Sequence, residues 1–348
     1  MRVVVTGASG NVGTSVMTAL AADPAVTSIV GLARRRPDHP LPKVEWAAAD
    51  VSRDDLDRPF AGADVVVHLA WLIQPSHRLD VVEATNVAGT ERVFEAAARA
   101  GARALVHASS VGAYSPGPKD TPVDEGWPTE GISTSFYSRH KVSTERLLDH
   151  FEAEHPSVRV VRLRPGLIFK REAASGIRRL FLGRLVPPQL LRPSRVPVVP
   201  RTDRLVFQAV HTDDVAQAYR LAVVGDGRGA YNVAADPVLD PVELGRILGA
   251  RPVPVPATVL RVAADLSWRA HLQPTPPGWV DLALGVPLMD TTRARRELGW
   301  QPTRTSGDAL RELLEGIADK ASGPTPPLAQ GGWWAPAVSP ETPQVPTS

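Results

Sequence analysis

The sequence has 348 residues, of which 43% are apolar and 22% are charged, an ordinary composition for a globular protein of about two domains. Its 39 Lys and Arg against 37 Asp and Glu give a net charge of +2, which argues against a general attraction to nucleic acid or to a membrane surface. The absence of cysteine excludes disulfides, thiolate metal sites and cysteine nucleophiles. We expect no metal site and no nucleic-acid or membrane partner.

The start of the chain does not resemble a secretory signal, because only three consecutive apolar residues stand between Arg2 and Thr6. Uncharged apolar runs elsewhere are much shorter than the roughly 20 residues that a transmembrane helix needs. A soluble, cytoplasmic protein is the expectation.

Short β-rich runs alternate with longer helical patterns over the first 165 residues. Most of the runs are nearly continuous apolar stretches, which is typical of strands covered on both faces of a parallel sheet. The alternation predicts an α/β fold with a Rossmann-like, doubly wound parallel sheet. The predicted strands are 2–6, 28–33, 44–49, 64–70, 104–109 and 158–164, and the predicted helices lie near 11–22, 78–100 and 136–154.

The pattern changes at Pro165. Residues 165–204 are rich in Arg and Pro and show little periodicity. Regular structure resumes with a helical pattern over 211–224 and a strand-like run over 230–234, and helical patterns continue to about residue 320.

These changes divide the chain into two domains and a tail. Residues 1–168 are expected to form a dinucleotide-binding Rossmann domain, to which the chain returns around 205–235. Residues 169–204 and 236–320 are expected to form a smaller, mostly C-terminal substrate-binding domain. The Pro-rich residues 321–348 are expected to be a disordered tail.

The first predicted strand leads directly into a glycine-rich turn, "TGASGNVG", and then into a helical pattern. Gly7 would permit the tight turn, Gly10 would let the backbone approach a pyrophosphate, and Gly13 would let the helix pack closely on the strand. The helix N-terminus would offer free N–H groups to the anion. In this strand–turn–helix context the glycine spacing predicts a dinucleotide-binding loop.

The end of the second predicted strand indicates which dinucleotide binds. An acidic residue there binds the adenosine ribose of NAD, whereas an arginine accommodates the extra phosphate of NADP. The sequence reads "GLARRR", with Ala33 in place of the carboxylate and with Arg34 and Arg35 after it. Guanidinium groups pair with phosphate in a forked geometry, so the sequence favours NADP over NAD. Arg36 also fits a solvated turn.

The segment "YSRHK" opens a predicted helix and places Tyr137 four residues before Lys141, on the same helix face. A phenol has a pKa of about 10, which is too high for a base near neutrality. A nearby ammonium and an oxidised nicotinamide would lower that pKa. The pair is therefore a candidate for the proton transfer that accompanies hydride transfer at a carbinol carbon.

Nine ordered motifs together resemble the extended short-chain dehydrogenases/reductases of the NAD-dependent epimerase/dehydratase type, over about residues 1–320. They are "TGASGNVG", "AAAD", "VVHLAW", "NVAGTERVFEAA", "HASSVGAYS", "YSRHK", "LRPGLIF", "VHTDDVAQA" and "RRELGWQP". The resemblance implies a cofactor site formed by Gly7, Ser9, Gly10, Asn11, Val12, Gly13, Arg34, Arg35, Asp50, Val51, Leu69, Ala70, Asn86, Tyr137, Lys141 and Pro165.

The resemblance also implies catalytic roles. Tyr137 would transfer the proton, Lys141 would hold the nicotinamide ribose, and a serine hydroxyl would orient the substrate oxygen. Two serines compete for that last role, and the usual distance from the "AY" segment favours Ser110 over Ser109. Asp50 would contact the adenine amino group.

Structural readings stay open for several of these residues. Asp50 also fits as the cap of a helix beginning near Ser52, and Asn86 fits a turn or a cap. His68 is expected to be a core histidine without a role in proton transfer. His211 and Asp214 fit a role in holding the domain junction together.

The chain departs from the family pattern at positions that bear on the substrate. Sugar-nucleotide dehydratases of this family carry an Asp–Glu pair where this chain has Val111 and Gly112, so dehydration by that route is not expected. Trp71 replaces a small residue, and Lys170 replaces a glycine. The arginine that binds diphosphate in sugar-nucleotide epimerases has its nearest counterpart in the more distant Arg204.

The leading hypothesis is an NAD(P)-dependent oxidoreductase or epimerase that acts on a secondary alcohol or its ketone, with a small-molecule substrate. The second is a ketone reductase that uses NADPH, of the hydroxysteroid or dihydroflavonol type. The third, from another class, is a non-catalytic NADP-binding sensor or scaffold. Family members often form homodimers through helices that flank the sheet, and the predicted helices near 78–100 and 136–154 are the candidates here.

Overall fold

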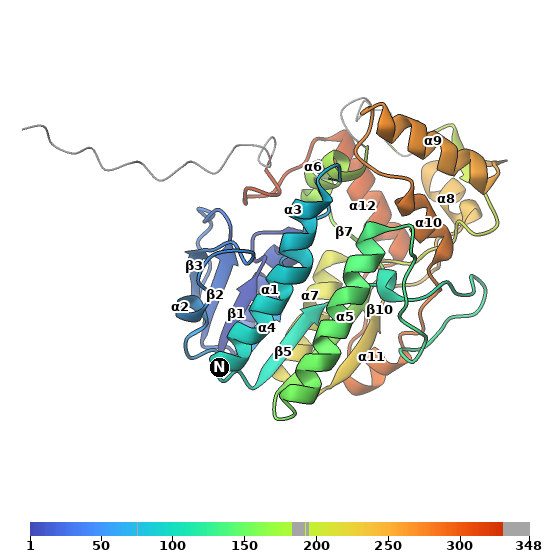
Figure 1. Ribbon diagram of the computed structural model, residues 1–348. Coiled ribbons are helices and arrows are strands. Elements are labelled where there is room, and N and C mark those ends of the chain that lie inside the picture. Colours follow the sequence, from blue (N-terminus) through green and yellow to red (C-terminus); the bar gives the residue numbers. More distant parts are fainter. Residues whose placement is uncertain (75, 183–191, 193–194, 330–348) are drawn as a thin grey trace, which may run out of the picture.

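The computed structural model describes residues 1–74, 76–182, 192 and 195–329 (Figure 1). Its central element is a seven-stranded parallel sheet with the strand order β10-β6-β5-β4-β1-β2-β3. This sheet confirms the predicted α/β, doubly wound fold. Its strands are β1 (Arg2–Thr6), β2 (Ser28–Ala33), β3 (Val44–Ala48), β4 (Val65–His68), β5 (Ala104–Ala108), β6 (Arg159–Pro165) and β10 (Gly229–Val233).

The strand order reverses at β1. The chain builds β2 and β3 on one side of β1 and then returns to place β4, β5 and β6 on the other side. At such a switch point the connections after neighbouring strands diverge, which leaves a crevice at the carboxyl ends of the strands. The glycine-rich turn after β1 and the segment after β4 therefore meet at this crevice.

Two layers of helices cover the sheet. The helices α1 (Asn11–Ala22) and α7 (Thr212–Val224) pack together on one face, and α4 (Gly89–Arg99) and α5 (Phe136–Glu154) pack together on the other, where α5 crosses in front of the strands in Figure 1. Alternate side chains of β1 supply both cores, with Val3 and Val5 under α1 and Val4 under α4. Nearly continuous valine runs are thus explained by burial on both faces.

Most of the remaining elements gather beside the carboxyl ends of the strands, at the upper right of Figure 1, whereas α11 (Thr292–Glu297) packs against β10 at the lower right of that view. A small core there is formed by Val199, Ala209, Leu239, Leu244, Ile247 and Leu310, among others. The elements are β7 (Leu167–Phe169), η3 (Arg171–Ala173), α6 (Ala174–Ile177), η4 (Arg178–Leu182), β8 (Val198–Arg201), β9 (Ala209–His211), α8 (Pro241–Leu248), β11 (Arg251–Pro254), α9 (Ala257–Arg269), α10 (Gly278–Gly285), α11 (Thr292–Glu297) and α12 (Ser306–Ala318).

Most of the predicted strands and helices occur within a few residues of the expected bounds. The helix expected near 78–100 is interrupted, because α3 (Leu79–Glu83) continues into a π-helical turn, η1 (Ala84–Ala88), before α4 begins. Two further short helices, α2 (Asp57–Phe60) and η2 (Val111–Ala113), lie between the strands.

The expectation of disorder from residue 321 onward is wrong for 321–329. Thr325 and Leu328 are buried, with 0% and 3% of their surface exposed, and Leu328 donates a backbone hydrogen bond to the Thr325 carbonyl. Prolines and glycines prevent a regular helix here, but they do not prevent packing. Residues 330–348 of the predicted tail lie outside the described residues.

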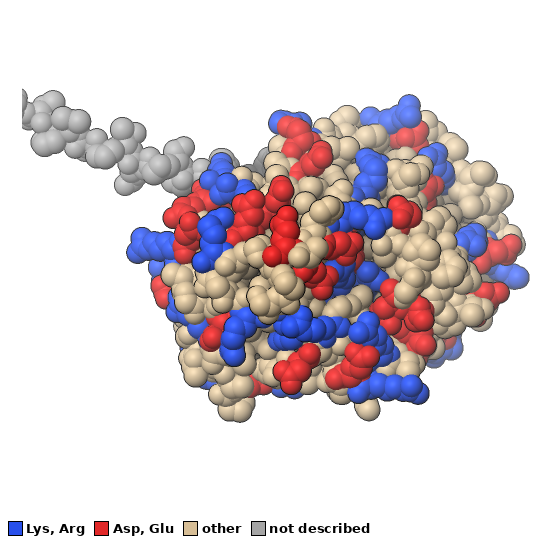
Figure 2. Space-filling model, turned by 60° about the horizontal axis from the view of Figure 1, so that its bottom comes forward, with Lys and Arg blue, Asp and Glu red and all other residues tan. Residues whose placement is uncertain are grey.

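Charged side chains of both signs are interspersed over the face shown in Figure 2, in keeping with the small net charge of the sequence. Among the described residues, the helices are all too short or too polar to cross a membrane.

The carboxylate of Asp214 fastens the last part of the chain to α7. One oxygen accepts hydrogen bonds from the Thr303 backbone N–H (2.9 Å) and hydroxyl (2.7 Å), and the other accepts one from the Arg304 N–H (3.2 Å). The indole of Trp300, which is fully buried, donates to the Asp214 carbonyl (2.7 Å). These contacts hold the segment that leads into α12.

We expect Asp214→Asn to lower the free energy of unfolding by about 1–3 kcal/mol, because the amide turns an N–H₂ group toward donors that then lose their acceptor. Urea denaturation measures this change. Asp203→Asn, at an exposed position, is the control and should shift stability by less than about 0.5 kcal/mol. Equal effects of the two substitutions would contradict the role assigned to Asp214.

Candidate active site

The glycine-rich turn has the geometry that its spacing predicts. Gly7 has a φ of +69°, and a Cβ there would lie 2.7 Å from the Ala70 nitrogen, so neither the conformation nor the space suits another residue. A Cβ on Gly13 would lie 2.3 Å from the Gly7 carbonyl oxygen. The turn therefore brings the start of α1 close against β1 and the segment after β4.

A cavity of about 220 Å³ lies at the switch point of the sheet. One side of the cavity is formed by the segments at the carboxyl ends of β4, β1, β2 and β3, which are neighbours in the sheet. Doubly wound sheets bind their ligands in such a crevice. Of the predicted cofactor residues, the cavity is lined by Gly7, Ser9, Gly10, Asn11, Arg34, Arg35, Asp50, Val51, Leu69 and Ala70. The opposite side was not predicted and consists of Ala173, Gly176, Ile177, Arg179, Leu180, Pro326, Pro327 and Leu328.

The other predicted cofactor residues do not line this cavity. Val12 and Gly13 belong to the packing of α1, and Pro165 ends β6. Asn86 is fully buried in the π-helical turn, where its side chain accepts from the Leu72 N–H (2.7 Å) and donates to the Leu72 carbonyl (2.8 Å). Asn86 thus fixes the segment after β4, and its neighbour Thr85 faces the cavity instead.

Asp50 closes a local turn at the wall of the cavity. Its carboxylate accepts hydrogen bonds from the Ser52 N–H (3.0 Å) and hydroxyl (2.7 Å). The next helix, α2, begins only at Asp57, so Asp50 does not cap a helix near Ser52. The position in the cavity is compatible with the adenine contact that the resemblance implies.

His68 is a core residue, as expected. Its two ring nitrogens pair with the hydroxyls of Thr6 (2.7 Å) and Thr90 (2.8 Å). Burial lowers its pKa to about 3, so the ring is neutral near pH 7.

Tyr137 and Lys141 lie in the first two turns of α5, whose start is capped by the Ser135 hydroxyl, the acceptor for the Ser138 N–H. Ser110 lies close to the Tyr137 phenol, because a Cβ built on Gly112 would lie 2.9 Å from the Tyr137 ring and 3.4 Å from the Ser110 hydroxyl oxygen. The Lys141 ammonium lies 5.8 Å from the centre of the Tyr137 ring. The structure therefore brings together the three residues that were predicted to be catalytic.

Trp71 lies between the cavity and this group. Its indole lines the cavity, and the Lys141 Nζ lies 3.3 Å from the centre of its ring. The Lys141 ammonium also donates to the Ala108 carbonyl (2.6 Å). Burial lowers the pKa of Lys141 to about 7, and the Glu145 carboxylate opposes that shift.

The protein's own surroundings act on the pKa of Tyr137. Burial of the phenol raises its pKa above the usual value near 10, and the neighbouring Ser110 offsets only part of that effect. The Lys141 ammonium contacts the Ala108 carbonyl and the face of Trp71. The phenol is therefore neutral near pH 7 and suited to donating a proton.

Aromatic side chains from distant segments surround the phenol. The Trp279 ring of α10 lies 4.9 Å from the Tyr137 ring, and the Trp71 ring lies 5.9 Å from it in an edge-on arrangement. Phe181 packs edge-on against Trp279 at 5.0 Å. No pattern in the sequence links Phe181 or Trp279 to Tyr137, because only the fold brings these segments together.

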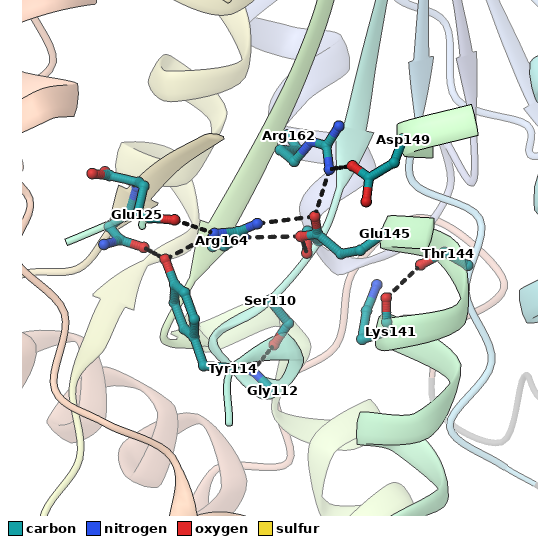
Figure 3. A network of polar contacts seen from close by, with 12 residues as sticks. Ser110, Gly112, Tyr114, Glu125, Lys141, Thr144, Glu145, Asp149, Arg162 and Arg164 are labelled. Atoms are coloured by element: carbon teal, nitrogen blue, oxygen red, sulfur yellow. Dashed lines mark hydrogen bonds and ion pairs between the residues drawn. The ribbon is translucent and has the colours of Figure 1, made fainter. Parts of the chain in front are cut away.

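A buried ionic network lies directly behind the candidate active site (Figure 3). The Glu145 carboxylate accepts from Arg164 (2.9 Å), Arg162 (2.8 Å) and the Ser109 hydroxyl (2.5 Å), and all four side chains are buried. Burial would raise the pKa of Glu145, but the hydrogen bond and charge of Arg164 and the charge of Arg162 outweigh it and lower the pKa to about 2.

This architecture defines a class of protein, the short-chain dehydrogenases/reductases with an extended chain, in which a doubly wound sheet presents a dinucleotide-binding loop at its switch point. The family model of the NAD dependent epimerase/dehydratase family matches residues 3–234, and the chain belongs to that family.

Relatives within the family carry out different reactions. The 4-hydroxy-2-methyl-3-oxo-4-farnesyl-3,4-dihydroquinoline-1-oxide ketoreductase of Stigmatella aurantiaca is 28% identical over 339 residues, which cover 90% of this chain and 96% of that protein. UDP-glucose 4-epimerase of Mycolicibacterium smegmatis is 27% identical over 337 residues, covering 92% and 100%. The structure of UDP-glucuronic acid 4-epimerase from Bacillus cereus with UDP-glucuronic acid and NAD has a TM-score of 0.65 at 18% identity, covering 92% and 100%.

We expect Glu145→Gln to destabilise the protein by about 3–5 kcal/mol at pH 7, because Arg162 and Arg164 then remain buried without their shared carboxylate. The stability that Glu145 supplies is present above its unfolded pKa of 4.5 and is lost as the pH falls toward 2. The stability of the variant should therefore fall less steeply than that of the parent between pH 4.5 and 3.

Urea denaturation at several pH values measures both effects. Asp149→Asn is the matched control, because Asp149 also pairs with Arg162 (2.7 Å) but is 51% exposed. This control should cost less than about 1 kcal/mol. A similar cost for both substitutions would show that the buried carboxylate is not the centre of the network.

Proposed function

We propose that the protein is an NADP(H)-dependent oxidoreductase that interconverts a ketone and a secondary alcohol on an apolar small molecule. The observation that carries the proposal is the proximity of Ser110, Tyr137 and Lys141, in a group that adjoins the cavity of the glycine-rich turn. The cavity fits a dinucleotide in its donor set, with the N-terminus of α1 at one wall and Arg34 and Arg35 at another.

When bound, the reduced nicotinamide supplies the hydride to the carbonyl carbon. Tyr137, neutral near pH 7, donates its phenolic proton to the carbonyl oxygen as negative charge develops there. Ser110 donates a hydrogen bond to the same oxygen and orients it. Lys141 would stabilise the phenolate left on Tyr137 and hold the nicotinamide ribose.

The aromatic surroundings of Tyr137 favour an apolar substrate over a nucleotide sugar. Trp71 and Trp279 present ring surface on two sides of the phenol, where a sugar would need hydrogen-bond partners. Arg204, the counterpart of a diphosphate-binding arginine, donates instead to the carbonyls of Leu284 (2.9 Å) and Gly117 (2.8 Å). The ketoreductase relative from Stigmatella aurantiaca agrees with this choice.

Epimerisation is the second candidate, and the relative from Mycolicibacterium smegmatis favours it. Dehydration is not proposed. A Cβ on Gly112 would lie 2.9 Å from the Tyr137 ring, so the acidic pair that dehydration requires has no room at that position without displacing the phenol. Net consumption of NADPH by a ketone distinguishes reduction from epimerisation, in which the cofactor is regenerated.

We expect Tyr137→Phe to reduce the rate of ketone reduction by about 10²–10⁴-fold, since the ring remains but the proton donor is lost. The assay follows NADPH absorbance with a panel of cyclic and aromatic ketones, with UDP-glucose and UDP-galactose tested for epimerisation in parallel. NADPH affinity should change little. Full turnover by the variant would contradict the role of Tyr137, and NADPH binding with no turnover of any substrate by the parent would favour the non-catalytic sensor.

We expect the double substitution Arg34→Ala and Arg35→Ala to weaken NADPH binding by about 10²–10⁴-fold and NADH binding much less, because each of the two charge-assisted hydrogen bonds to the 2′-phosphate is worth about 1.5–3 kcal/mol. Titration by NADPH fluorescence measures both affinities. Arg36→Ala is the matched control, since Arg36 is exposed and does not line the cavity. Equal or tighter binding of NADH than NADPH by the parent would refute the preference for NADP.

A further inference from the structure

The chain returns to the cofactor cavity after its last helix. In Figure 1 the red segment after α12 passes beside α6, and residues 324–328 of this segment are called the strap. Hydrogen bonds attach the strap to the glycine-rich turn and to η4. The Thr325 hydroxyl donates to the Ser9 carbonyl in the glycine-rich turn (2.7 Å), and Arg179 donates to the Pro327 carbonyl (3.0 Å).

The strap is a folded turn. The Gly323 N–H donates to the Leu328 carbonyl (3.0 Å), and the Leu328 N–H donates to the Thr325 carbonyl (2.9 Å), so the turn is closed on itself. A Cβ on Gly323 would lie 2.9 Å from the Leu328 side chain, which shows how tightly that side chain packs. The preceding segment is fastened by the Ser175 hydroxyl, which donates to the Ala321 carbonyl (2.7 Å).

The position of the strap matters because its apolar side faces the cavity. Pro326, Pro327 and Leu328 line the same cavity as the glycine-rich turn. Thr325 is fully buried, so its hydroxyl satisfies a loop carbonyl in a place that water does not reach. Apolar cover over a phosphate-binding loop lowers the local dielectric constant and strengthens the hydrogen bonds from the loop to an anion.

The strap also holds a positive charge at the cavity. Arg179 and Arg35 both line the cavity, and the pKa of Arg179 is lowered by burial and by the charge of Arg35. Two guanidinium groups that repel each other across a cavity gain most when an anion lies between them. The hydrogen bond to the Pro327 carbonyl fixes one of the two.

We propose that the strap is a cofactor-binding element of this protein, in which Thr325 anchors the turn to the glycine-rich loop and Pro326–Leu328 close over the adenosine and pyrophosphate portion of NADP(H), with Arg179 positioned as a further anion-binding residue. The inference rests on the proposed function, since it assigns the strap to the same cofactor. A wall that must open for release is expected to act mainly on the dissociation rate.

The test uses the full chain with the strap detached by Thr325→Val and Leu328→Ala together. The dissociation rate of NADPH is measured by stopped-flow displacement, its Kd by fluorescence titration, and the melting temperature without cofactor in parallel. We expect Kd and the dissociation rate each to rise about tenfold, because a bound cofactor that is no longer covered on one side leaves its pocket more easily. The single substitution Thr325→Val should give a smaller change in the same direction.

Two controls separate a binding role from a structural one. Thr121→Val with Leu272→Ala makes the same chemical changes at exposed positions outside the cavity and should leave Kd unchanged. A chain that ends after Ala329 keeps the strap and should bind NADPH as the full chain does. A lower melting temperature with unchanged NADPH affinity and dissociation rate in the strap variant would overturn the proposal. If the parent bound neither NADPH nor NADH, the proposed function would fail together with this inference.

Discussion

The candidate active site depends on the ion pairs and hydrogen bonds that the buried Glu145 carboxylate makes. Tyr137, Lys141 and Glu145 are spaced by four residues, so they lie in a row along one face of α5. The last of them is bonded to Arg162 and Arg164 on β6 and to Ser109 after β5. Because Ser109 directly precedes Ser110, one carboxylate fixes both the helix that carries the phenol and the loop that carries its hydroxyl partner.

The same network supports the buried charge of Lys141. Lys141 is buried, and its charge is supported by the Ala108 carbonyl, the face of Trp71 and the Glu145 carboxylate one turn away. Glu145 in turn is supported by two arginines, which keep it ionised far below neutral pH. Each buried charge is therefore close to one of opposite sign, from the two arginines on β6 to Glu145 and from Glu145 to Lys141. Lys141 lies beside the cavity and the phenol.

The sequence predicted those parts of the site that depend on local geometry. The glycines at 7, 10 and 13 dictate a turn within one strand–helix unit, and the spacing of Tyr137 and Lys141 dictates a shared helix face, so both were readable without knowledge of the fold. Trp279 and Thr325 could not be found in this way. Their contacts with Tyr137 and Ser9 join segments more than a hundred residues apart, and no periodic pattern encodes such a pairing.

Composition did not predict the packing of the first residues after 320. The Pro-rich residues after 320 lack a helical or strand period, yet Thr325 and Leu328 are as buried as the core of the sheet. The pKa of Tyr137 likewise depends on the fold, because burial of the phenol raises it.

Burial shifts the pKa values of the two central groups in opposite directions, upward for Tyr137 and downward for Lys141. Both shifts favour the neutral forms, so neither group has a strong tendency to ionise before a ligand arrives. A neutral phenol beside a hydroxyl gives up its proton most easily when negative charge develops on an adjacent oxygen. Reduction of a carbonyl creates that charge at the right moment, whereas oxidation of an alcohol would first require the phenolate. In the proposed reaction, the apolar enclosure thus keeps Tyr137 in the protonated form that carbonyl reduction uses.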